Sequence, residues 1–489
     1  MRYLVIMTDL LNVHMVTLGC ARNEVDSEEL AARLEAGGFR LVDDAADADT
    51  VMVNTCGFVE QAKKDSIDTL IEASELKSEG RTKAVIAVGC MAERYGKELA
   101  DSMPEADAVL GFDDYSDIAG RLQTILAGGH HESHVPRDRR TLLPLTPAAR
   151  SAASSRVAIP GHGAASAPVA ADLPTGLAPA SGPRTLRKRL GNSPYAPLKI
   201  ASGCDRRCAF CAIPRFRGSY LSRTASEVVE EARWLVDHGV KEVFLVSENS
   251  SSYGKDLGDI RALEKLLVDL SEVDGLDWIR VSYLQPAELR PSLVQAMVAT
   301  DKVVPYFDLS FQHASASVLR RMRRFGDAES FLGLIDQVRT LAPQAGIRSN
   351  VIAGFPGETE ADVEILKQFL IDARLDVVGV FGYSDEDETE AMTLSDHVDP
   401  YEVEARAAEL SDLASELCAQ RAEDRIGEVL TVLVESREDG EVVGRAEHQG
   451  PEVDGTTTIV GSNAAVGEFV LAAVTSSDGV DLIAEEVGA

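Results

Sequence analysis

Short apolar runs alternate with amphipathic segments along most of the chain, and this alternation restricts the fold more than any other feature of the sequence. Residues 13–18, 50–54 and 83–88 are near-continuous apolar runs, which is typical of strands buried on both faces of a parallel sheet. Amphipathic, helix-like segments follow them, among them residues 23–36. The first 128 residues therefore predict an α/β domain with a doubly wound parallel sheet.

The same alternation resumes after residue 197 and continues to about residue 410. Repeated strand–helix pairs predict a partial (β/α) barrel, in which the loops after the strands build the functional site. From about residue 426 the helical pattern is lost, and runs such as 429–434 and 468–474 predict a small antiparallel β-barrel. The candidate strands of the partial barrel are residues 197–202, 241–247, 277–284, 304–311, 347–355 and 377–383.

A segment of different composition separates the two α/β parts. Ten of the chain's 19 prolines lie between Pro136 and Pro197, amid alanine, serine and glycine. Such a segment lacks the apolar periodicity that a core needs, so it predicts a flexible Pro/Ala-rich linker or insertion. The predicted domains are residues 12–128, 194–420 and 421–489, with the linker over 129–193.

The charge of the chain restricts its partners. It has 48 basic and 80 acidic residues, a net charge of −32, and an acidic surface repels phosphate backbones. Nucleic acid is therefore disfavoured, and a basic protein is the more natural partner. No apolar run reaches the length of about 18 residues that a transmembrane helix needs, and no secretory signal is evident, which predicts a cytoplasmic protein.

Three of the seven cysteines form the strongest motif. Cys204, Cys208 and Cys211 have C-x3-C-x2-C spacing in the loop after the first strand of the predicted barrel. Three thiolates can hold three irons of a cubane cluster and leave the fourth iron open to a small molecule, whereas closed electron carriers use four. A zinc site is the alternative, but structural zinc takes four ligands and no fourth Cys or His lies nearby in the sequence.

A second set of three cysteines follows three strands of the N-terminal domain. Cys20, Cys56 and Cys90 each lie just beyond the C-terminal end of a predicted parallel strand, and these ends share one edge of the sheet. We expect the three thiols to converge there as a second cluster site. The alternative is that they are small buried residues, since free cysteine is often buried. Cys418 lies in an Ala- and Leu-rich helical run, so we expect it to be an ordinary residue of the hydrophobic core.

These motifs resemble the radical SAM (S-adenosylmethionine) methylthiotransferase family. The resemblance rests on residues 18–27, 54–58 and 88–91, on the C-x3-C-x2-C run with Phe210 before its last cysteine, and on residues 354–359. It makes the first domain a methylthiotransferase domain, the second a radical SAM domain and the last a TRAM-like domain. It implies two [4Fe-4S] clusters, one held by each set of three cysteines, and an electron donor such as flavodoxin or ferredoxin. One SAM would methylate sulfur at the first cluster, and a second would yield the radical that removes hydrogen from an unactivated carbon.

Other residues near the radical SAM motif are weaker candidates. Phe210, Gly354, Gly357 and Glu358 are predicted to contact the cofactor, with an ordinary tight turn as the alternative for the glycines. His313 is more often a structural histidine than a catalyst. Arginines that surround the motif are candidates for binding carboxylates, with charge balance for an anionic cluster as the alternative; they are Arg206, Arg207, Arg215 and Arg217.

Two substrates of the family compete. Residues 379–389 and 247–254 look like the RimO type, which modifies the β-carbon of an aspartate in the twelfth small-subunit ribosomal protein, rather than the transfer-RNA adenosine (MiaB) type. Residues 421–489 hold four arginines, no lysine and 15 acidic residues, hence 4 − 15 = −11, a charge suited to a basic protein. A non-catalytic iron–sulfur or zinc scaffold is a further alternative. The carboxylates proposed to attract the ribosomal protein are Glu435, Glu438, Asp439, Glu441, Glu447, Glu452 and Asp454.

Overall fold

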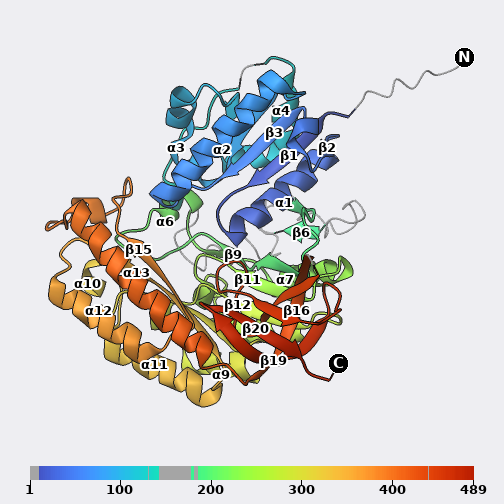
Figure 1. Cartoon of the computed structure of the whole chain (residues 1–489). Coiled ribbons are helices and arrows are strands. Elements are labelled where there is room, and N and C mark those ends of the chain that lie inside the picture. Colours follow the sequence, from blue (N-terminus) through green and yellow to red (C-terminus); the bar gives the residue numbers. More distant parts are fainter. Residues whose placement is uncertain (1–9, 130, 142–177, 181–184, 439, 489) are drawn as a thin grey trace, which may run out of the picture. The chain divides into compact units, whose positions relative to one another are not determined.

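The computed structural model describes residues 10–129, 131–141, 178–180, 185–438 and 440–488 (Figure 1). The chain divides into two compact units. Of the described residues, the N-terminal unit takes 10–129, 131–141, 178–180, 185–191 and the short segment Arg215–Gly218, and the C-terminal unit takes the others. Within the described ranges, no helix combines the length and the apolar character needed to cross a membrane.

The N-terminal unit is built on a five-stranded sheet with strand order β2-β1-β3-β4-β5, and all of its pairings are parallel. This confirms the predicted doubly wound sheet; the two-residue strands β2 and β5 are too short to leave an apolar run in the sequence. The elements are β1 (Asn12–Thr17), α1 (Ala21–Ala36), β2 (Arg40–Leu41), β3 (Thr50–Thr55), α2 (Glu60–Glu79), β4 (Ala84–Val88), α3 (Gly89–Ser102), β5 (Ala108–Val109) and α4 (Ile118–Leu126).

Both faces of this sheet are buried, which explains the continuous apolar runs. Met52 and Ile86 pack on one face with Leu30 and Leu34 of α1. The alternate strand residues, among them Val53, pack on the other face. Burying whole strands on two faces is the arrangement that a parallel sheet with helices on either side requires.

The predicted linker lies partly outside the described residues, which omit 142–177 and 181–184. Its described ends pack on the N-terminal unit. Arg139 forms an ion pair with the buried Glu93. Strand β7 (Thr185–Arg187), which pairs with β6 (Ala178–Ala180), places the fully buried Arg187 guanidinium 2.5 Å from Glu28 Oε2. The domain boundaries stay a prediction.

The C-terminal unit contains the six predicted parallel strands. They form two three-stranded sheets, β8-β11-β12 and β13-β14-β15, and a parallel bridge between Leu284 and Leu309 joins them. Its elements are β8 (Tyr195–Lys199), β9 (Ala201–Ser202), β10 (Leu221–Ser222), α7 (Ala225–Asp237), β11 (Glu242–Val246), α8 (Ala262–Ser271), β12 (Trp278–Val281), α9 (Pro291–Ala299), β13 (Tyr306–Gln312), α10 (Ala316–Arg321), α11 (Ala328–Leu341), β14 (Gly346–Ala353), α12 (Glu360–Ala373), β15 (Val377–Gly382) and α13 (Pro400–Glu423).

The last five strands close into a barrel of order β16-β17-β18-β20-β19. The predicted small barrel is confirmed, with one difference in detail: β18 pairs with β20 in parallel, while the other four pairings are antiparallel. Strand β19 lies between β18 and β20 in the sequence and runs antiparallel to β20, so the chain reverses direction twice before β20 pairs with β18. The strands are β16 (Val429–Glu438), β17 (Glu441–Ala446), β18 (Thr457–Val460), β19 (Phe469–Asp478) and β20 (Asp481–Glu486).

Buried charges join this C-terminal barrel to the parallel strands. Arg445 of β17 lies 2.7 Å from Glu242 of β11, which also binds Arg280 of β12 at 2.6 Å, and all three side chains are almost fully buried. Asp454 accepts a hydrogen bond from Tyr306 and lies 3.1 Å from Arg348 Nε. The barrel and the partial barrel therefore share one interface of paired, buried charges.

This interface corrects the proposed acidic surface. Asp454 is buried, and Glu435 is bound to Arg445 at 2.6 Å, so neither carboxylate is available to attract a partner. Glu447 is half-buried, whereas Glu441 and Glu452 are exposed as predicted. The side chain of Glu438 and all of Asp439 lie outside the described residues. The exposed carboxylates that remain on the barrel also include Glu468, Asp478, Asp481 and Glu485.

Candidate active site

Cys20, Cys56 and Cys90 follow β1, β3 and β4, which are neighbours in the N-terminal sheet. Cys20 is the N-cap residue of α1, and Cys90 lies in the first turn of α3. The preceding Gly19 has a φ of +92°, and a Cβ there would lie 2.8 Å from Cys56 Cβ, so glycine lets the β1 and β3 ends approach closely. The structure thus brings the three predicted thiols to one sheet edge.

Cations and burial set the charge state of these thiols. Burial raises the pKa of Cys90 to about 11, although Arg217 opposes the shift. Burial also acts on Cys20, but Arg22 and Arg217 outweigh it and lower its pKa below the usual thiol value. Arg217 Nη2 lies 3.1 Å from Cys90 Sγ and 3.0 Å from Asn23 Oδ1. A guanidinium against the thiols favours the thiolate form that binds iron.

Cys204, Cys208 and Cys211 lie in the loop of residues 203–211, called here the cluster loop, which follows β9. The backbone N–H of Arg206 donates to Cys204 Sγ over 3.4 Å, and Arg324 Nη1 lies 3.8 Å from Cys208 Sγ. Burial raises the pKa of Cys204 to about 12, and the neighbouring Cys211 and Cys208 thiolates add to this. Three adjacent thiols with cationic and N–H partners form a donor set that fits an anionic iron–sulfur cluster.

The donor sets differ from single-ion sites. Among the residues the structure describes, no three His, Cys, Asp or Glu side chains are gathered as they would be around one metal ion. The ligands of a cubane cluster each bind a different iron, so their sulfur atoms stand further apart than the ligands of one zinc. Cys418 is buried in α13, as the sequence predicts.

The predicted cofactor contacts have structural partners of their own. Gly354 and Gly357 have positive φ angles of 76° and 82°, and a Cβ on Gly354 would lie 2.5 Å from Val403. Glu358 is buried, accepts from the Gly354 N–H over 2.9 Å, and lies 3.0 Å from Arg406 Nη1. The turn therefore explains both glycines without a ligand. Cofactor contact by these residues stays a prediction.

His313 and Phe210 are also held by neighbours. The Ser315 N–H donates to His313 Nδ1 over 2.9 Å, so Nε2 carries the ring proton, and it lies 3.2 Å from Glu358 Oε2. The Phe210 ring packs edge-on to Phe355, with centroids 6.5 Å apart. These contacts agree with the interpretation of His313 as a structural histidine.

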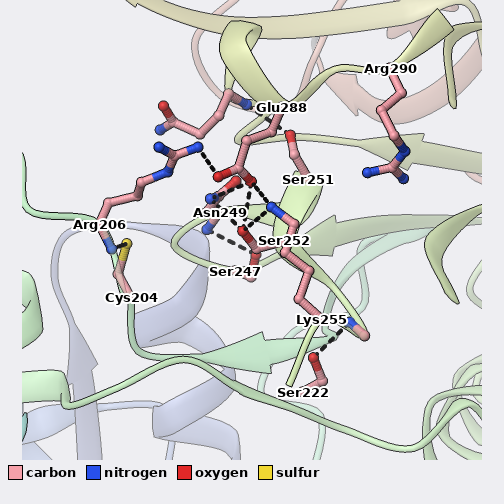
Figure 2. Close-up of polar contacts among 12 residues, drawn as sticks. Cys204, Arg206, Ser222, Ser247, Asn249, Ser251, Ser252, Lys255, Glu288 and Arg290 are labelled. Carbon is pink, nitrogen blue, oxygen red and sulfur yellow. Dashed lines mark hydrogen bonds and ion pairs between the residues drawn. The ribbon is translucent and has the colours of Figure 1, made fainter. Parts of the chain in front are cut away.

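A group centred on Glu288 was not predicted. Glu288 ends the short helix η6 (Pro286–Glu288) after β12, and its carboxylate binds Arg206 of the cluster loop (Figure 2). Lys255, Ser252 and Asn249 bind the same carboxylate. The sequence signal was weak, because a single glutamate in a loop of a chain with 80 acidic residues is unremarkable.

A large hollow lies at the C-terminal end of β15. Its volume is about 910 Å³, and Tyr383, Asp385, His397 and Glu404 are among its lining residues. Tyr383 and Asp385 belong to the segment 379–389 that looked like the RimO type. Nearby, Gln312 ends β13 with a φ of +70°, an uncommon backbone conformation for a non-glycine residue.

Comparison with known sequences identifies the parts. Three family profiles match: Uncharacterized protein family UPF0004 over residues 12–111, the Radical SAM superfamily over 198–370, and the TRAM domain over 426–487. A Cutibacterium acnes protein named ribosomal protein uS12 methylthiotransferase RimO is 68% identical over 98% of this chain and 99% of its own length. The chain belongs to the RimO family of radical SAM methylthiotransferases. The predicted resemblance, the three-part fold and the enzyme class are thereby confirmed.

A second relative of the same name supports this assignment, and one solved structure shares the fold. The Streptomyces coelicolor protein of the same name is 62% identical over 97% of this chain and 96% of its own length. The radical S-adenosylmethionine methyltransferase TsrM from Kitasatospora setae, solved with tryptophan and a SAM analogue, is 14% identical. It matches with a TM-score of 0.51 over 76% of this chain and 72% of its own, which is a likeness of fold.

Proposed function

We propose that this enzyme adds a methylthio group to the β-carbon of an aspartate in the ribosomal protein uS12. The observation that carries the proposal is the presence of two sets of three cysteines, one just after β1, β3 and β4 and the other in the loop after β9. One set alone would suit a simpler radical SAM enzyme, whereas transfer of sulfur needs a second place to hold it. The relatives named uS12 methylthiotransferase support the substrate.

The proposal includes two [4Fe-4S] clusters. Cys20, Cys56 and Cys90 would hold the first, and the second would be bound by the cluster loop through Cys204, Cys208 and Cys211. When bound, the clusters and SAM supply a methylated sulfur and a radical able to remove hydrogen from carbon. The chain's own part is to position the thiols, with the Arg217 guanidinium against one set and the Arg206 backbone N–H against the other.

Further parts of the proposal concern contacts and partners. Phe210, Gly354, Gly357 and Glu358 would line the cofactor position, and flavodoxin or ferredoxin would supply electrons. The four-part division at residues 12–128, 129–193, 194–420 and 421–489 is proposed to describe the domains. The enzyme would act in the cytoplasm, where uS12 is made.

Transfer RNA is the competing substrate, and a non-catalytic scaffold the competing role. The charge of −11 over residues 421–489 favours a basic protein over RNA, because RNA binding relies on cationic contacts with phosphates. Three ligands in each set, which leave one iron of each cluster open to a small molecule, favour catalysis over a closed structural site.

Mass spectrometry of uS12 and of transfer RNA from a strain lacking the gene tests the function. We expect the methylthio group on uS12 to be absent there, to return with the intact gene, and to stay absent with Cys208→Ala. Cys418→Ala is the matched control and should restore modification. Loss of a methylthio group from transfer RNA, with uS12 unchanged, would replace the proposal with the MiaB-type function.

A further inference from the structure

The Glu288 carboxylate binds partners from two other loops, the cluster loop and the loop after β11 (Figure 2). One oxygen, Oε1, faces the Arg206 guanidinium of the cluster loop. The other, Oε2, accepts from Ser252 Oγ at 2.6 Å and Lys255 Nζ at 2.7 Å, with Asn249 Nδ2 at 3.2 Å. The two oxygens therefore bind different segments: Oε1 binds the cluster loop, and Oε2 binds the loop after β11.

The Glu288 side chain is only 10% exposed, so these charge-assisted bonds are shielded from water. Helix η6 begins with Pro286, whose ring restricts the backbone next to Glu288. The N–H of Gln285 donates to Ser251 Oγ over 2.9 Å, which ties the start of η6 to the same loop. Glu288 is thus held from its backbone as well as from its carboxylate.

Arg206 connects this rigid group to the thiols. It lies in the sequence between Cys204 and Cys208, and its own backbone N–H donates to Cys204 Sγ over 3.4 Å. Fixing the Arg206 side chain therefore fixes the peptide group that contacts a predicted cluster ligand. On its other side the cluster loop is tied by the Ala209 N–H, which donates to Met322 O over 3.0 Å.

We propose that Glu288 is a positioning residue that clamps the cluster loop through Arg206 and thereby holds Cys204 and Cys208 ready for the iron–sulfur cluster. The inference rests on the proposed function, because it takes the three cysteines of the cluster loop as ligands. Residues that orient metal ligands without touching the metal change metal affinity by about 10–100-fold when they are removed. We expect an effect of that size on cluster retention.

A second ion pair in the same unit provides a matched control. Arg290 binds Glu264 of α8 at 3.1 Å, with exposed fractions of 26% and 13%, close to the 32% and 10% of Arg206 and Glu288. Neither Arg290 nor Glu264 contacts a cysteine among the described contacts. Glu264→Gln therefore removes a similar charge with no path to the cluster loop.

The test uses the full chain carrying Cys20→Ala, Cys56→Ala and Cys90→Ala, so that only the cluster loop binds iron. Glu288→Gln, Glu288→Asp and Glu264→Gln are compared in this background. After anaerobic reconstitution, the rate of iron loss to a chelator and the electron paramagnetic resonance spectrum of the reduced cluster are measured. We expect Glu288→Gln to lose iron about tenfold faster with an altered spectrum, Glu288→Asp to be intermediate, and Glu264→Gln to match the background.

Thermal unfolding of the iron-free proteins separates positioning from folding. Glu288→Gln should unfold at the same temperature as Glu264→Gln; if it fails to fold, Arg206→Met tests the clamp from the other side and should also speed iron loss about tenfold. In the double variant with Glu288→Gln and Arg206→Met, the two effects on the rate of iron loss should not add, because each change removes the same contact. Equal iron loss from Glu288→Gln and Glu264→Gln would overturn the clamp. A background protein that binds no iron at all would instead overturn the proposed ligand set.

Discussion

Arg217 is the residue that most clearly gives the N-terminal thiols a chemical role. It contacts Cys90, Asn23 and Asp26, the last at 3.1 Å, so its charge is held against the thiols by a buried carboxylate. Thiols that merely filled a core would need no such cation. Arg217 therefore favours the thiolate form of these cysteines and opposes the burial that raises the pKa of Cys90.

A residue-scale prediction follows for the N-terminal thiols. Replacing Cys20, Cys56 or Cys90 with alanine should leave reductive SAM cleavage intact but abolish methylthio transfer, since only sulfur delivery depends on them. Formation of 5′-deoxyadenosine and modification of uS12 are measured side by side. Cys418→Ala is the control and should change neither quantity. Persistent methylthio transfer by the Cys90→Ala enzyme would show that these cysteines only pack in the core.

The cluster loop makes the complementary prediction. Cys204→Ala, Cys208→Ala and Cys211→Ala should each lower bound iron by one cluster and stop SAM cleavage, because the open iron that binds SAM is lost. Iron and sulfide per chain and 5′-deoxyadenosine formation are the measurements. Normal SAM cleavage by any of the three variants would contradict the assignment.

Sequence reasoning found the six cysteines because their spacing and their position after strands are readable along the chain. It could not find Glu288 or Arg217 as partners, because the Arg206–Glu288 contact spans 82 residues and the Arg217–Cys90 contact spans 127. Such contacts depend on the loop conformations, which leave no local pattern. The same limit applies to the glycines of residues 354–357: the sequence did not reveal that Val403 packs against Gly354 and Arg321 against Gly357.

At the scale of elements, the buried charges of β17, β11 and β12 hold the C-terminal barrel in place. Burial raises the pKa of Glu242, but Arg280 and Arg445 outweigh it and lower the pKa overall. Removing one cation leaves a carboxylate buried with a single partner, a defect that typically costs about 3–5 kcal/mol. The strands themselves were predictable from their apolar runs, whereas this shared ionic layer was not.

We therefore expect Arg445→Met to lower the free energy of unfolding of the C-terminal unit by about 3–5 kcal/mol. Arg437→Met, on the exposed part of β16, is the matched control and should change it by no more than about 0.5 kcal/mol. Urea unfolding followed by fluorescence of Trp278, which packs beside Phe469 of β19, measures both. Equal free energies of unfolding for Arg445→Met and Arg437→Met would show that the buried ion pairs of Arg445 make no net contribution to stability.

A second element-scale prediction concerns acid stability of the N-terminal sheet. Asp49 lies just before β3, binds the Asn12 N–H and Arg81, and lies 3.0 Å from Lys83. Burial raises its pKa, but these bonds prevail and lower it to about 2. Because the folded pKa lies below the unfolded value, the stabilisation is present above about pH 4 and is lost as the pH falls towards 2.

Asp49→Asn should therefore lower stability at pH 7 by about 2 kcal/mol and make acid unfolding between pH 4 and 2 less steep. Circular dichroism across an acid titration compares this variant with the intact chain. Asp47→Asn, at an exposed carboxylate two residues earlier, should leave the titration unchanged. Acid-unfolding curves of equal steepness for Asp49→Asn and the intact chain would contradict the role of this carboxylate.

For the whole molecule, a net charge of −32 makes the rate of encounter with a basic protein depend on salt. Exposed charges are screened over about 8–10 Å at moderate ionic strength, so association with uS12 should slow as salt rises. Neutralising Glu441, Glu452, Glu468 and Asp481 together should slow association more than it speeds release. Neutralising four exposed carboxylates of α2 is the control for charge alone; these are Asp65, Asp68, Glu72 and Glu75.

Stopped-flow association of the full-length variants with uS12 and with transfer RNA, across a salt series, checks this prediction. If both neutralised sets slow association equally, only net charge matters and the barrel has no special part. Tight, salt-sensitive binding of transfer RNA by the intact enzyme would favour the competing substrate.

The interlocked charges between the C-terminal barrel and the parallel strands also bear on how this protein can be divided. A fragment that begins after α13 would keep the Arg445–Glu435 ion pair but lose Glu242, so Arg445 would lose one of its two carboxylate partners. The remaining piece would keep Glu242, Arg280 and Arg348 without their partners from the barrel. The barrel is thus not an exchangeable module, and a gene fusion that swapped it would need to carry the matching residues of β11, β12 and β14 with it.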